Sequence, residues 1–437
     1  MRPPAWPIQR CYSRPVSVES VPVVSRSSRL LALAPILLGL SCTLRVAANT
    51  GSYLIRGDGF FDLHTYWLSG PALAHPGTLY DLFYLDPTKN EQLRFIYPPF
   101  AAEVFYPLHF LPFGVVAFIW QLGLIAATYG SVRLCQRLVG DGSQRAAMLW
   151  TAAAIWLEPL GGCMEVGQVG IFLMLALLYA AYSTRWWVSG LLVGLAAGIK
   201  LSPAVTGFYF VGMRRWAAAA FSAVVFFATV ALSYLVASED TRRYFAHQMG
   251  EVGGSLAVGS AWNQSWRGGL SRIVGHDVGS GPILIGAVVL TAVLAVVAWR
   301  ALDTDTDRLG PLLVVQFFGL LAAPVSWSHH WVWVLPLMIW LLNGPWRAEP
   351  GARALGWGWF GTAGPTAAGA SSGERTPMRR SATTPSSRPT SGASSGSARW
   401  LRTTPSPLIC MNNRTNSSRG SSRTGERHCC RRFHMAQ

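Results

Sequence analysis

The stretch from residue 57 to residue 112 is polar and aromatic, and it holds the side chains best suited to chemistry. Its central element is the run Asp-Leu-His-Thr-Tyr at residues 62–66, in which a carboxylate begins a pattern of helical period. A carboxylate in such a position can act as a general base that removes a hydroxyl proton. The structural alternative is an N-cap, in which Asp62 accepts backbone N–H bonds at the start of an interfacial helix. The pattern alone favours the two interpretations equally.

Two further motifs hold side chains that could bind an anionic or sugar substrate. His329 and His330 follow Trp327, so they fit either an aromatic belt at a membrane surface or imidazoles that bind an anionic headgroup. Asn263 and Arg267 offer an amide and a guanidinium, which suit sugar hydroxyls and a phosphate. Each motif is weak evidence when it is taken by itself.

Several single residues have both a functional and a structural interpretation. Lys200, in the run Gly-Ile-Lys-Leu-Ser-Pro at 198–203, is either a snorkelling side chain or a phosphate contact, and the run itself suggests a kinked or re-entrant pair of segments. Gln168, like Glu158 and Glu165, is a candidate for the lining of a pocket, but it could equally cap a helix end. Asp58 lies between two glycines, which favours a turn residue over a catalyst, so it is retained only as an alternative base.

The composition is that of an integral membrane protein. Hydrophobic residues make up 51% and charged residues 13% of the chain, and apolar runs recur at lengths suited to a hydrocarbon core. Much of the net charge of +16 arises from arginines after residue 361, so it does not indicate a nucleic-acid partner. The 7 cysteines lack metal-ligand spacing, and no nucleotide-binding glycine loop is present. We therefore expect no metal site, no cofactor and no nucleotide-dependent mechanism.

About ten apolar segments predict an all-α polytopic membrane protein built as a multi-helix transmembrane bundle. They lie at residues 30–48, 109–131, 146–160, 166–182, 186–199, 203–213, 216–237, 282–299, 309–325 and 331–342. With the N-terminus in the cytoplasm, every predicted inner loop contains arginine, as the positive-inside rule requires. The same topology places four connections on the outer face, at 49–108, 158–168, 238–281 and 326–330. Polar groups that converge there predict an outward-facing site.

The segments predict three regions: a basic cytoplasmic N-terminus at 1–29, a transmembrane catalytic domain at 30–345, and a tail at 361–437. The tail is rich in Ser, Arg and Pro, so it cannot bury a core and is expected to be disordered. Its abrupt change of composition indicates a shifted reading frame. The alternative is a basic cytoplasmic tail that binds anionic lipid.

The order of the motifs resembles that of a known enzyme family. Besides the run at 62–66, the chain contains Leu-Tyr at 79–80, Tyr-Pro-Pro-Phe-Ala-Ala at 97–102, Gly-Gln at 167–168, Ile-Lys-Leu-Ser-Pro at 199–203, Asn-Gln-Ser at 263–265 and Ser-Trp-Ser-His-His at 326–330. Over about residues 30–342, these motifs resemble the polyprenol-phosphate-mannose-dependent α-1,2-mannosyltransferases of mycobacteria and their relatives. These enzymes form glycosyltransferase family 87 of the GT-C superfamily, and the likeness is greatest to members that extend phosphatidylinositol mannosides.

The resemblance implies a GT-C-type bundle that transfers mannose, with inversion, from polyprenyl-phosphate mannose to a phosphatidylinositol mannoside or lipoglycan at the outer face of the plasma membrane. Asp62 would be the general base, and His329 and His330 would hold the donor phosphate or the acceptor. Arg267 and Lys200 are further candidates for phosphate contacts. The leaving phosphate needs no proton, so one carboxylate suffices. The other residues expected to line the substrate pocket are Tyr66, Asn263 and Gln168.

Two other functions stay open at this stage. A GT-C transferase could use another polyprenyl-phosphate sugar, such as arabinose or glucose, because the residues do not display which sugar hydroxyls are bound. A secondary transporter could also contain broken helices and buried polar residues. The sequence shows neither the internal repeat nor the midplane charges that are typical of transporters.

Overall fold

The computed structural model of the chain describes residues 27–85, 92–251 and 258–362. Within these ranges the chain is mainly α-helical, and its named strands are limited to an antiparallel pair, β1 (Phe83–Leu85) and β2 (Gln92–Arg94). The all-α prediction is therefore confirmed. The predicted N-terminal region at 1–29 and the tail at 361–437 lie almost wholly outside the described residues.

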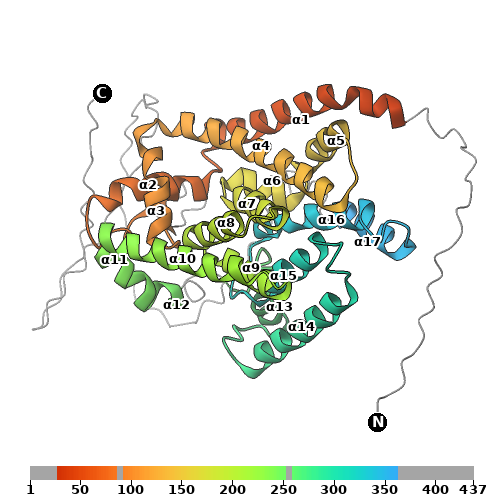
Figure 1. Cartoon of the computed structure of the whole chain (residues 1–437). Helices are drawn as coiled ribbons and strands as arrows, with labels where there is room; N and C mark the ends of the chain where they lie inside the picture. Colours follow the sequence, from red (N-terminus) through yellow and green to blue (C-terminus); the bar gives the residue numbers. More distant parts are fainter. Residues whose placement is uncertain (1–26, 86–91, 252–257, 363–437) are drawn as a thin grey trace, which may run out of the picture.

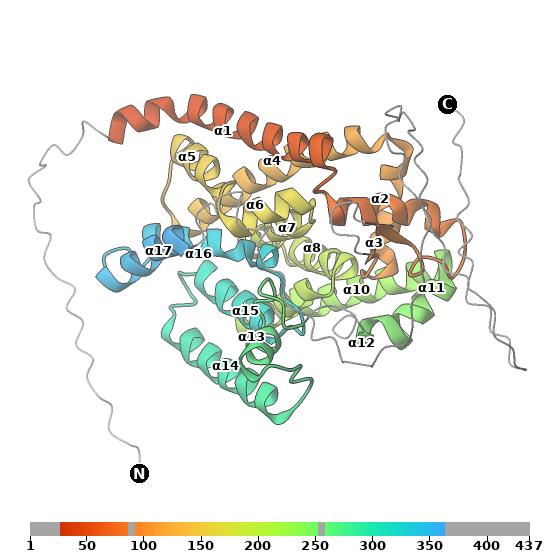
Figure 2. The same cartoon turned by 180° about the vertical axis from the view of Figure 1, so that it is seen from behind.

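Among the described residues, four helices are long and apolar enough to cross a membrane: α1 (Ser27–Arg56), α4 (Phe113–Val139), α10 (Trp216–Val236) and α14 (Pro282–Ala301). Three shorter apolar helices accompany them: α7 (Gly170–Tyr182), α8 (Trp186–Ile199) and α15 (Leu309–Ala322). Helices α1 and α14 form opposite edges of the molecule, with α6, α7 and α8 between them (Figures 1 and 2). Both edge helices expose large apolar side chains, which include Ile36 in α1 and Val289 in α14. Apolar surface on this scale identifies a multi-pass membrane protein.

The remaining helices are short and lie mostly between the long ones. They are α2 (Phe61–Leu73), α3 (Pro99–Phe105), α5 (Gln144–Ala154), α6 (Glu158–Val166), α9 (Thr206–Gly212), α11 (Ser238–Arg243), α12 (Met249–Glu251), α13 (Trp266–Val274), α16 (Val334–Asn343) and α17 (Pro350–Thr362). Short 3₁₀-helices are η1 (Tyr106–Phe110), η2 (Ser202–Val205) and η4 (Ser328–Trp333), and η3 (Tyr244–Gln248) is a short π-helix.

Two boundaries differ from the sequence-based expectation, and one predicted break is confirmed. The first span continues to Arg56 rather than ending near residue 48, so the predicted loop at 49–108 begins later and contains α2 and α3. The predicted single span at 146–160 is divided into α5 and α6, because Leu157 is extended ahead of Pro159 in the first turn of α6. The predicted break between the segments at 186–199 and 203–213 is present: Lys200 is extended, and Pro203 lies in the short turn η2 that follows.

Connections that the sequence assigns to the inner side contact one another. The Arg215 guanidinium, which precedes α10, donates to the Ser183 carbonyl ahead of α8 over 2.8 Å. Arg347, which follows α16, pairs with Asp141 between α4 and α5, with the Nη1 and Oδ2 atoms 3.2 Å apart. These loops therefore gather at one end of the bundle.

Connections assigned to the outer side contact one another as well. Arg243 of α11 makes a two-pronged ion pair with Asp81, with N–O distances of 2.7 and 2.9 Å. Asn263 pairs with Trp327 as an isolated antiparallel bridge. Helices α2, α3 and α11 lie together at one end of the molecule and α17 lies at the other (Figures 1 and 2). These contacts join neighbouring loops, and the assignment of the loops to the two sides of a membrane stays a prediction.

Helices α8 and α10 approach closely along three glycines at four-residue spacing. A Cβ atom added to Gly190 would lie 2.9 Å from the Ala218 carbonyl oxygen. One added to Gly194 would lie 2.5 Å from the Cβ of Val225, and one added to Gly198 would meet α10 in the same way. Small residues at such an interface let two backbones approach, which is the main source of helix association in a membrane.

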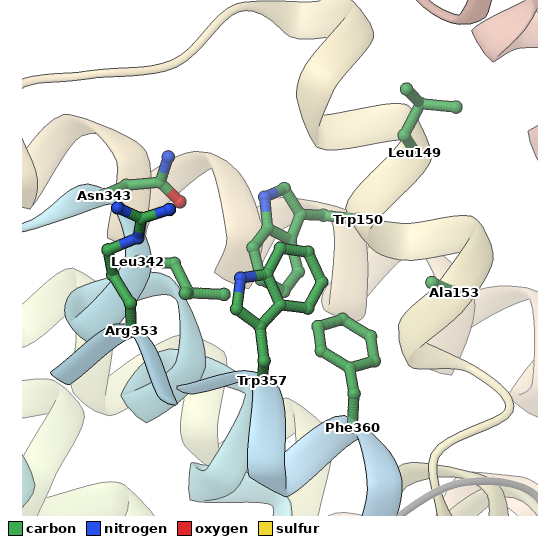
Figure 3. A pocket seen from close by; sticks show the side chains of 8 residues that line it. All are labelled: Leu149, Trp150, Ala153, Leu342, Asn343, Arg353, Trp357 and Phe360. Carbon is green, nitrogen blue, oxygen red and sulfur yellow. The ribbon is translucent and has the colours of Figure 1, made fainter. Parts of the chain in front are cut away.

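A groove of about 470 Å³ lies between α5, α16 and α17, away from the polar residues singled out in the sequence. Trp150 and Phe360 face each other across it with ring centroids 5.6 Å apart, and Trp357 extends the aromatic wall (Figure 3). Arg353 and Asn343 form its polar end (Figure 3). Its lining holds one cation and no carboxylate or imidazole, so it lacks the groups that general acid–base chemistry needs.

The glycine-lined contact can be tested with one added methyl group. Gly194→Ala should destabilise the detergent-solubilised protein by about 1–3 kcal/mol, because the new Cβ overlaps Val225. Thermal unfolding measures the change. The matched control is Gly286→Ala in α14, where no atom lies within 4 Å of the added Cβ and alanine favours the helix. Equal melting temperatures for the two variants would contradict the close approach of α8 and α10.

Candidate active site

A sharp turn between α1 and α2 sets the position of Asp62. Gly57, Gly59 and Phe60 all have positive φ angles, of 69°, 111° and 55°, so the chain bends sharply between the end of α1 and the start of α2. The Phe60 N–H then donates to the Glu165 carbonyl of α6 over 2.7 Å. A left-handed aromatic residue is strained and persists only where its surroundings hold it. The turn therefore fixes the start of α2 against α6.

The turn between α6 and α7 presents the partner of Asp62. Gly167 ends α6 with a φ of 73°, and a Cβ atom there would lie 2.6 Å from the Cβ of Leu63 in α2. Only glycine allows both this backbone conformation and this approach. The next residue, Gln168, is 1% exposed and lies against the first turns of α2.

The Gln168 side-chain amide uses both of its ends. Its Oε1 accepts from the Tyr66 hydroxyl and from the Val169 N–H, each over 2.8 Å. Its Nε2 donates to the Asp62 Oδ2 and to the Tyr97 hydroxyl, each over 2.9 Å. Because a backbone N–H can only donate, it fixes which end of the amide is the oxygen. Gln168 therefore must turn its N–H groups toward Asp62.

The N-cap interpretation of Asp62 is not what the structure shows. Helix α2 begins at Phe61 and its N-cap position is Phe60, so Asp62 already lies within the first turn. Its carboxylate bonds to the Gln168 side chain, and it keeps 27% of its side-chain surface exposed. Burial raises the pKa of Asp62 to about 6, although the charge of Lys200 and the Gln168 bond oppose the rise. A pKa close to neutrality suits a general base.

Lys200 lies at the break between α8 and η2, where its backbone is extended. Its ammonium nitrogen is 3.1 Å from the His330 Nε2 and 5.6 Å from the ring centroid of Tyr97. Burial lowers the pKa of Lys200 to about 8, and the charge of Asp62 partly offsets this effect. Among the described residues, no carboxylate lies within ion-pair distance of Lys200.

The two imidazoles lie inside this cluster rather than in an exposed belt. Burial, followed by the charge of Lys200, lowers the pKa of His329 to about 3 and that of His330 well below its usual range. Both rings are therefore neutral. The His329 Nε2 is 3.9 Å from the Asp62 Oδ2, which is too far for a hydrogen bond.

The hydrogen-bond partners of His330 make the cluster a site for an anion. The Trp327 N–H lies 3.3 Å from its Nδ1, and the Lys200 ammonium lies 3.1 Å from its Nε2. A neutral imidazole accepts at one ring nitrogen only, so in the tautomer that accepts at Nδ1 the Nε2–H and the ammonium are neighbouring donors. Two adjacent donors call for an acceptor that both can share, such as a phosphate oxygen.

Asn263 and Arg267 have partners of their own. The Asn263 Oδ1 accepts from the N–H groups of Ser265 and Ser326, and its Nδ2 donates to the Val258 carbonyl. Asn263 thus holds the chain that leads into η4 and its histidines. Arg267 makes a two-pronged ion pair with Asp277, with N–O distances of 2.9 and 2.5 Å. The structure brings neither side chain into the cluster around Asp62, and their substrate contacts stay predictions.

Of the other predicted site residues, Tyr66 is bonded to the cluster and Asp58 is not. Tyr66 is fully buried and bonds to Gln168, so it supports the cluster from behind rather than lining an open pocket. Asp58 lies in the turn before α2, as its flanking glycines predict, and no hydrogen bond joins it to the cluster. Its role as an alternative base stays a prediction. Within the described ranges, no group of three or more His, Cys, Asp or Glu side chains is placed to hold a metal ion.

Two further residues belong to the cluster: Tyr97, which was not predicted from the sequence, and Glu158, which was expected either to line a pocket or to cap a helix end. Tyr97 bonds to Gln168 and faces Lys200, but a tyrosine ahead of two prolines carries no sequence signal for such a role. Glu158 begins α6, bonds to Ser328 and lies against Gly162, as His329 does. Burial raises the pKa of Glu158. Its position ahead of a proline reads as an ordinary helix start.

A near-neutral carboxylate, two neutral imidazoles and a buried cation thus lie together in this multi-pass membrane protein, and such a cluster offers a base and hydrogen-bond donors for an anion. Residues 95–324 match the model of glycosyltransferase family 87. The chain therefore belongs to glycosyltransferase family 87, and it is a glycosyltransferase. The family match includes Tyr97, Gln168 and Lys200, whereas Asp62 and the histidine pair lie outside it.

Relatives of known function agree with this assignment. The chain is 58% identical over 347 residues to the polyprenol-phosphate-mannose-dependent alpha-(1-2)-phosphatidylinositol pentamannoside mannosyltransferase of Mycolicibacterium smegmatis. The aligned region covers 79% of this chain and 84% of that protein. The chain is 54% identical over 342 residues to the protein of the same name from Mycobacterium tuberculosis, which covers 77% and 78%. It is also 33% identical over 309 residues to a phosphatidylinositol mannoside mannosyltransferase of Mycobacterium tuberculosis, with 66% and 70% covered. No solved structure matches the chain.

The ion pair of Arg267 generates a direct test. If the guanidinium only tethers Asp277, Arg267→Gln and Asp277→Asn should each keep sugar-transfer activity close to that of the wild type and change the stability by about 0–1 kcal/mol. Activity and thermal unfolding of both variants check this. A large rise in the donor KM for Arg267→Gln, without one for Asp277→Asn, would instead make Arg267 a phosphate contact.

Proposed function

We propose that this chain transfers mannose from a polyprenyl-phosphate mannose to a phosphatidylinositol mannoside with an α-1,2 linkage. Its relatives at 58% and 54% identity carry names that state this donor and this linkage. The observation that carries the proposal is the juxtaposition of a near-neutral carboxylate, Asp62, with the paired donors Lys200 and His330. A base and an anion site are the two functions that such a transfer requires.

The proposed reaction is a single displacement with inversion at the anomeric carbon. The acceptor hydroxyl oxygen forms a bond to that carbon while the bond from the carbon to the phosphate oxygen breaks. Asp62 takes the hydroxyl proton. Lys200 and the Nε2–H of His330 stabilise the charge that collects on the leaving phosphate. The phosphate leaves as an anion and needs no proton, so a second catalytic carboxylate is not required.

We further infer the orientation of the protein and its location in the plasma membrane. The arginine-bearing loops that meet near Arg215 and Arg347 would face the cytoplasm, in keeping with the positive-inside rule. The cluster around Asp62 would then face outward, where nucleotides are scarce and an activated sugar must arrive on a lipid. His329 and Glu158, on the exposed side of Asp62, are the side chains best placed to contact the acceptor.

The first test compares the wild-type chain with Asp62→Asn in membranes of a host that lacks this activity. Labelled mannose on a polyprenyl phosphate should appear in phosphatidylinositol mannosides with the wild type, and at least about 10²-fold more slowly with Asp62→Asn, because asparagine keeps the shape but cannot take the proton. Equal expression and melting temperature serve as the control. Retained turnover in the variant would move the base to another carboxylate, such as Asp58.

The pKa values of the two charged groups predict a bell-shaped pH dependence of kcat/KM. Below about pH 6 Asp62 is protonated and cannot act as a base, so activity falls as the pH falls. Above about pH 8 Lys200 loses its charge and with it the attraction for the donor phosphate, so activity falls as the pH rises. Lys200→Arg should remove the alkaline decline and keep the acidic one, because a guanidinium stays charged. An unchanged alkaline decline in this variant would assign it to another group.

A further inference from the structure

Three buried side chains behind Asp62 form a closed ring of hydrogen bonds. The single hydroxyl hydrogen of Tyr66 belongs to the bond with the Gln168 Oε1, over 2.8 Å. The Tyr97 hydroxyl receives an N–H from the Gln168 Nε2 over 2.9 Å, so its own hydrogen can point to the Tyr66 oxygen, 3.0 Å away. Every bond in the ring then runs in one direction. Bonds arranged in this way polarise and strengthen one another.

Burial keeps water away from the two tyrosine hydroxyls of this ring. Tyr66 is 0% exposed and Tyr97 is 5% exposed, so water does not replace a lost partner. The ring of Phe105 stacks on Tyr66 with centroids 4.4 Å apart. The Tyr80 hydroxyl donates to the Tyr97 carbonyl over 2.9 Å, and this bond lies outside the ring of side-chain hydrogen bonds. A polar atom left unpaired at this depth destabilises the arrangement strongly.

Tyr97 also faces the cation. The Lys200 ammonium lies 5.6 Å from the centroid of its aromatic ring, within the range of a cation–π interaction. The hydroxyl and the ring face of one side chain therefore point at different parts of the site. The hydroxyl reaches Asp62 through Gln168, and the ring face reaches Lys200 directly.

We propose that Tyr97 is a positioning residue that holds the base and the cation of the transfer site in a fixed mutual arrangement, with Gln168 as the link to the base. The inference rests on the proposed function and deepens it. Through Gln168, the ring occupies the Oδ2 of Asp62 and leaves Oδ1 as the atom that meets the acceptor hydroxyl. Through its aromatic face, Tyr97 keeps Lys200 beside His330, where the donor phosphate would bind.

The two halves of this role can be removed one at a time. Tyr97→Phe keeps the ring face and loses the hydroxyl, so kcat should fall about 10- to 100-fold while the donor KM is unchanged. Tyr97→Leu loses both, so the donor KM should rise in addition, by about tenfold. The matched control is Tyr80→Phe, which removes a buried hydroxyl bond to the same residue's backbone and leaves the ring of hydrogen bonds intact. If Tyr97→Phe keeps the wild-type kcat, or if Tyr80→Phe reproduces its loss, the proposal fails.

The pH profile of Gln168→Glu distinguishes a hydrogen-bonding role of Gln168 from a purely space-filling one. Its new carboxyl oxygen replaces the N–H that faces Asp62, and two carboxyl groups that share a site hold one proton more tightly. The acidic decline of the pH profile should therefore move upward by at least about one pH unit, with activity partly recovered at higher pH. The titratable groups facing Asp62, which could also contribute to its titration, are Tyr66, Tyr97, Lys200, His329 and Cys163. An unshifted decline would overturn the role of Gln168 as the link.

A measurement without turnover separates this proposal from the proposed function. The carboxyl stretch of Asp62 can be titrated by infrared difference spectroscopy, with Asp62→Asn to assign the band. Tyr97→Phe should raise the midpoint, because the carboxylate loses a firmly aimed donor, whereas Tyr80→Phe should not. If the wild type transfers no mannose but this shift appears, the positioning role stands and the proposed substrate is wrong. If mannose is transferred and the shift is absent, the positioning role is wrong.

Discussion

The bond between the Gln168 amide and the Asp62 carboxylate is the constraint on which the rest of the site depends. A carboxylate this deep in a membrane protein must receive a hydrogen bond or lose its charge. Gln168 donates such a bond when its N–H groups face Asp62. The Tyr66 hydroxyl and the Val169 N–H hold it in this orientation, because both donate to its oxygen. The approach of α2 to the α6–α7 turn follows from the same need. Gly167 allows that approach, and the strained turn at Phe60 holds the start of α2 in place.

Burial acts on Asp62 and Lys200 in opposite senses, and both pKa values move toward neutrality. Each charge loses water, and their mutual attraction only partly compensates because they do not form a direct ion pair. The neutral imidazoles beside them add hydrogen-bonding capacity without adding charge. An arriving phosphate would supply the anion that Lys200 lacks, and an acceptor hydroxyl would meet a carboxylate that is ready to take a proton. The separation of the two charges is thus part of the proposed mechanism, because a tight ion pair would neutralise both groups.

The fold class could be predicted from the sequence, and several of the predicted site residues lie together in the structure. Hydropathy is a local signal, so the helical membrane bundle could be predicted. The break at Lys200 could be predicted as well, because Pro203 carries a local steric signal. The role of Tyr97 could not, because it depends on a partner 71 residues away. Arg267 shows the same limit: its type suits a phosphate, but the sequence does not show that Asp277, ten residues further on, pairs with it. A residue's chemistry can be read from its type, whereas its partners follow from the fold.

The breaks in the apolar segments explain why these residues lie where they do. Irregular backbone within a membrane protein leaves N–H and C=O groups unpaired unless the protein supplies partners, so it is tolerated mainly where it lines a site. The chain interrupts its helices ahead of Glu158, at Gly167 and at Lys200, and each interruption presents a side chain of the cluster or its immediate support. A continuous helix through any of these points would satisfy its own backbone but turn the side chain toward a neighbouring helix. Interrupting the helices therefore brings a base, an amide and a cation together within a bundle whose remaining surface is built to face lipid.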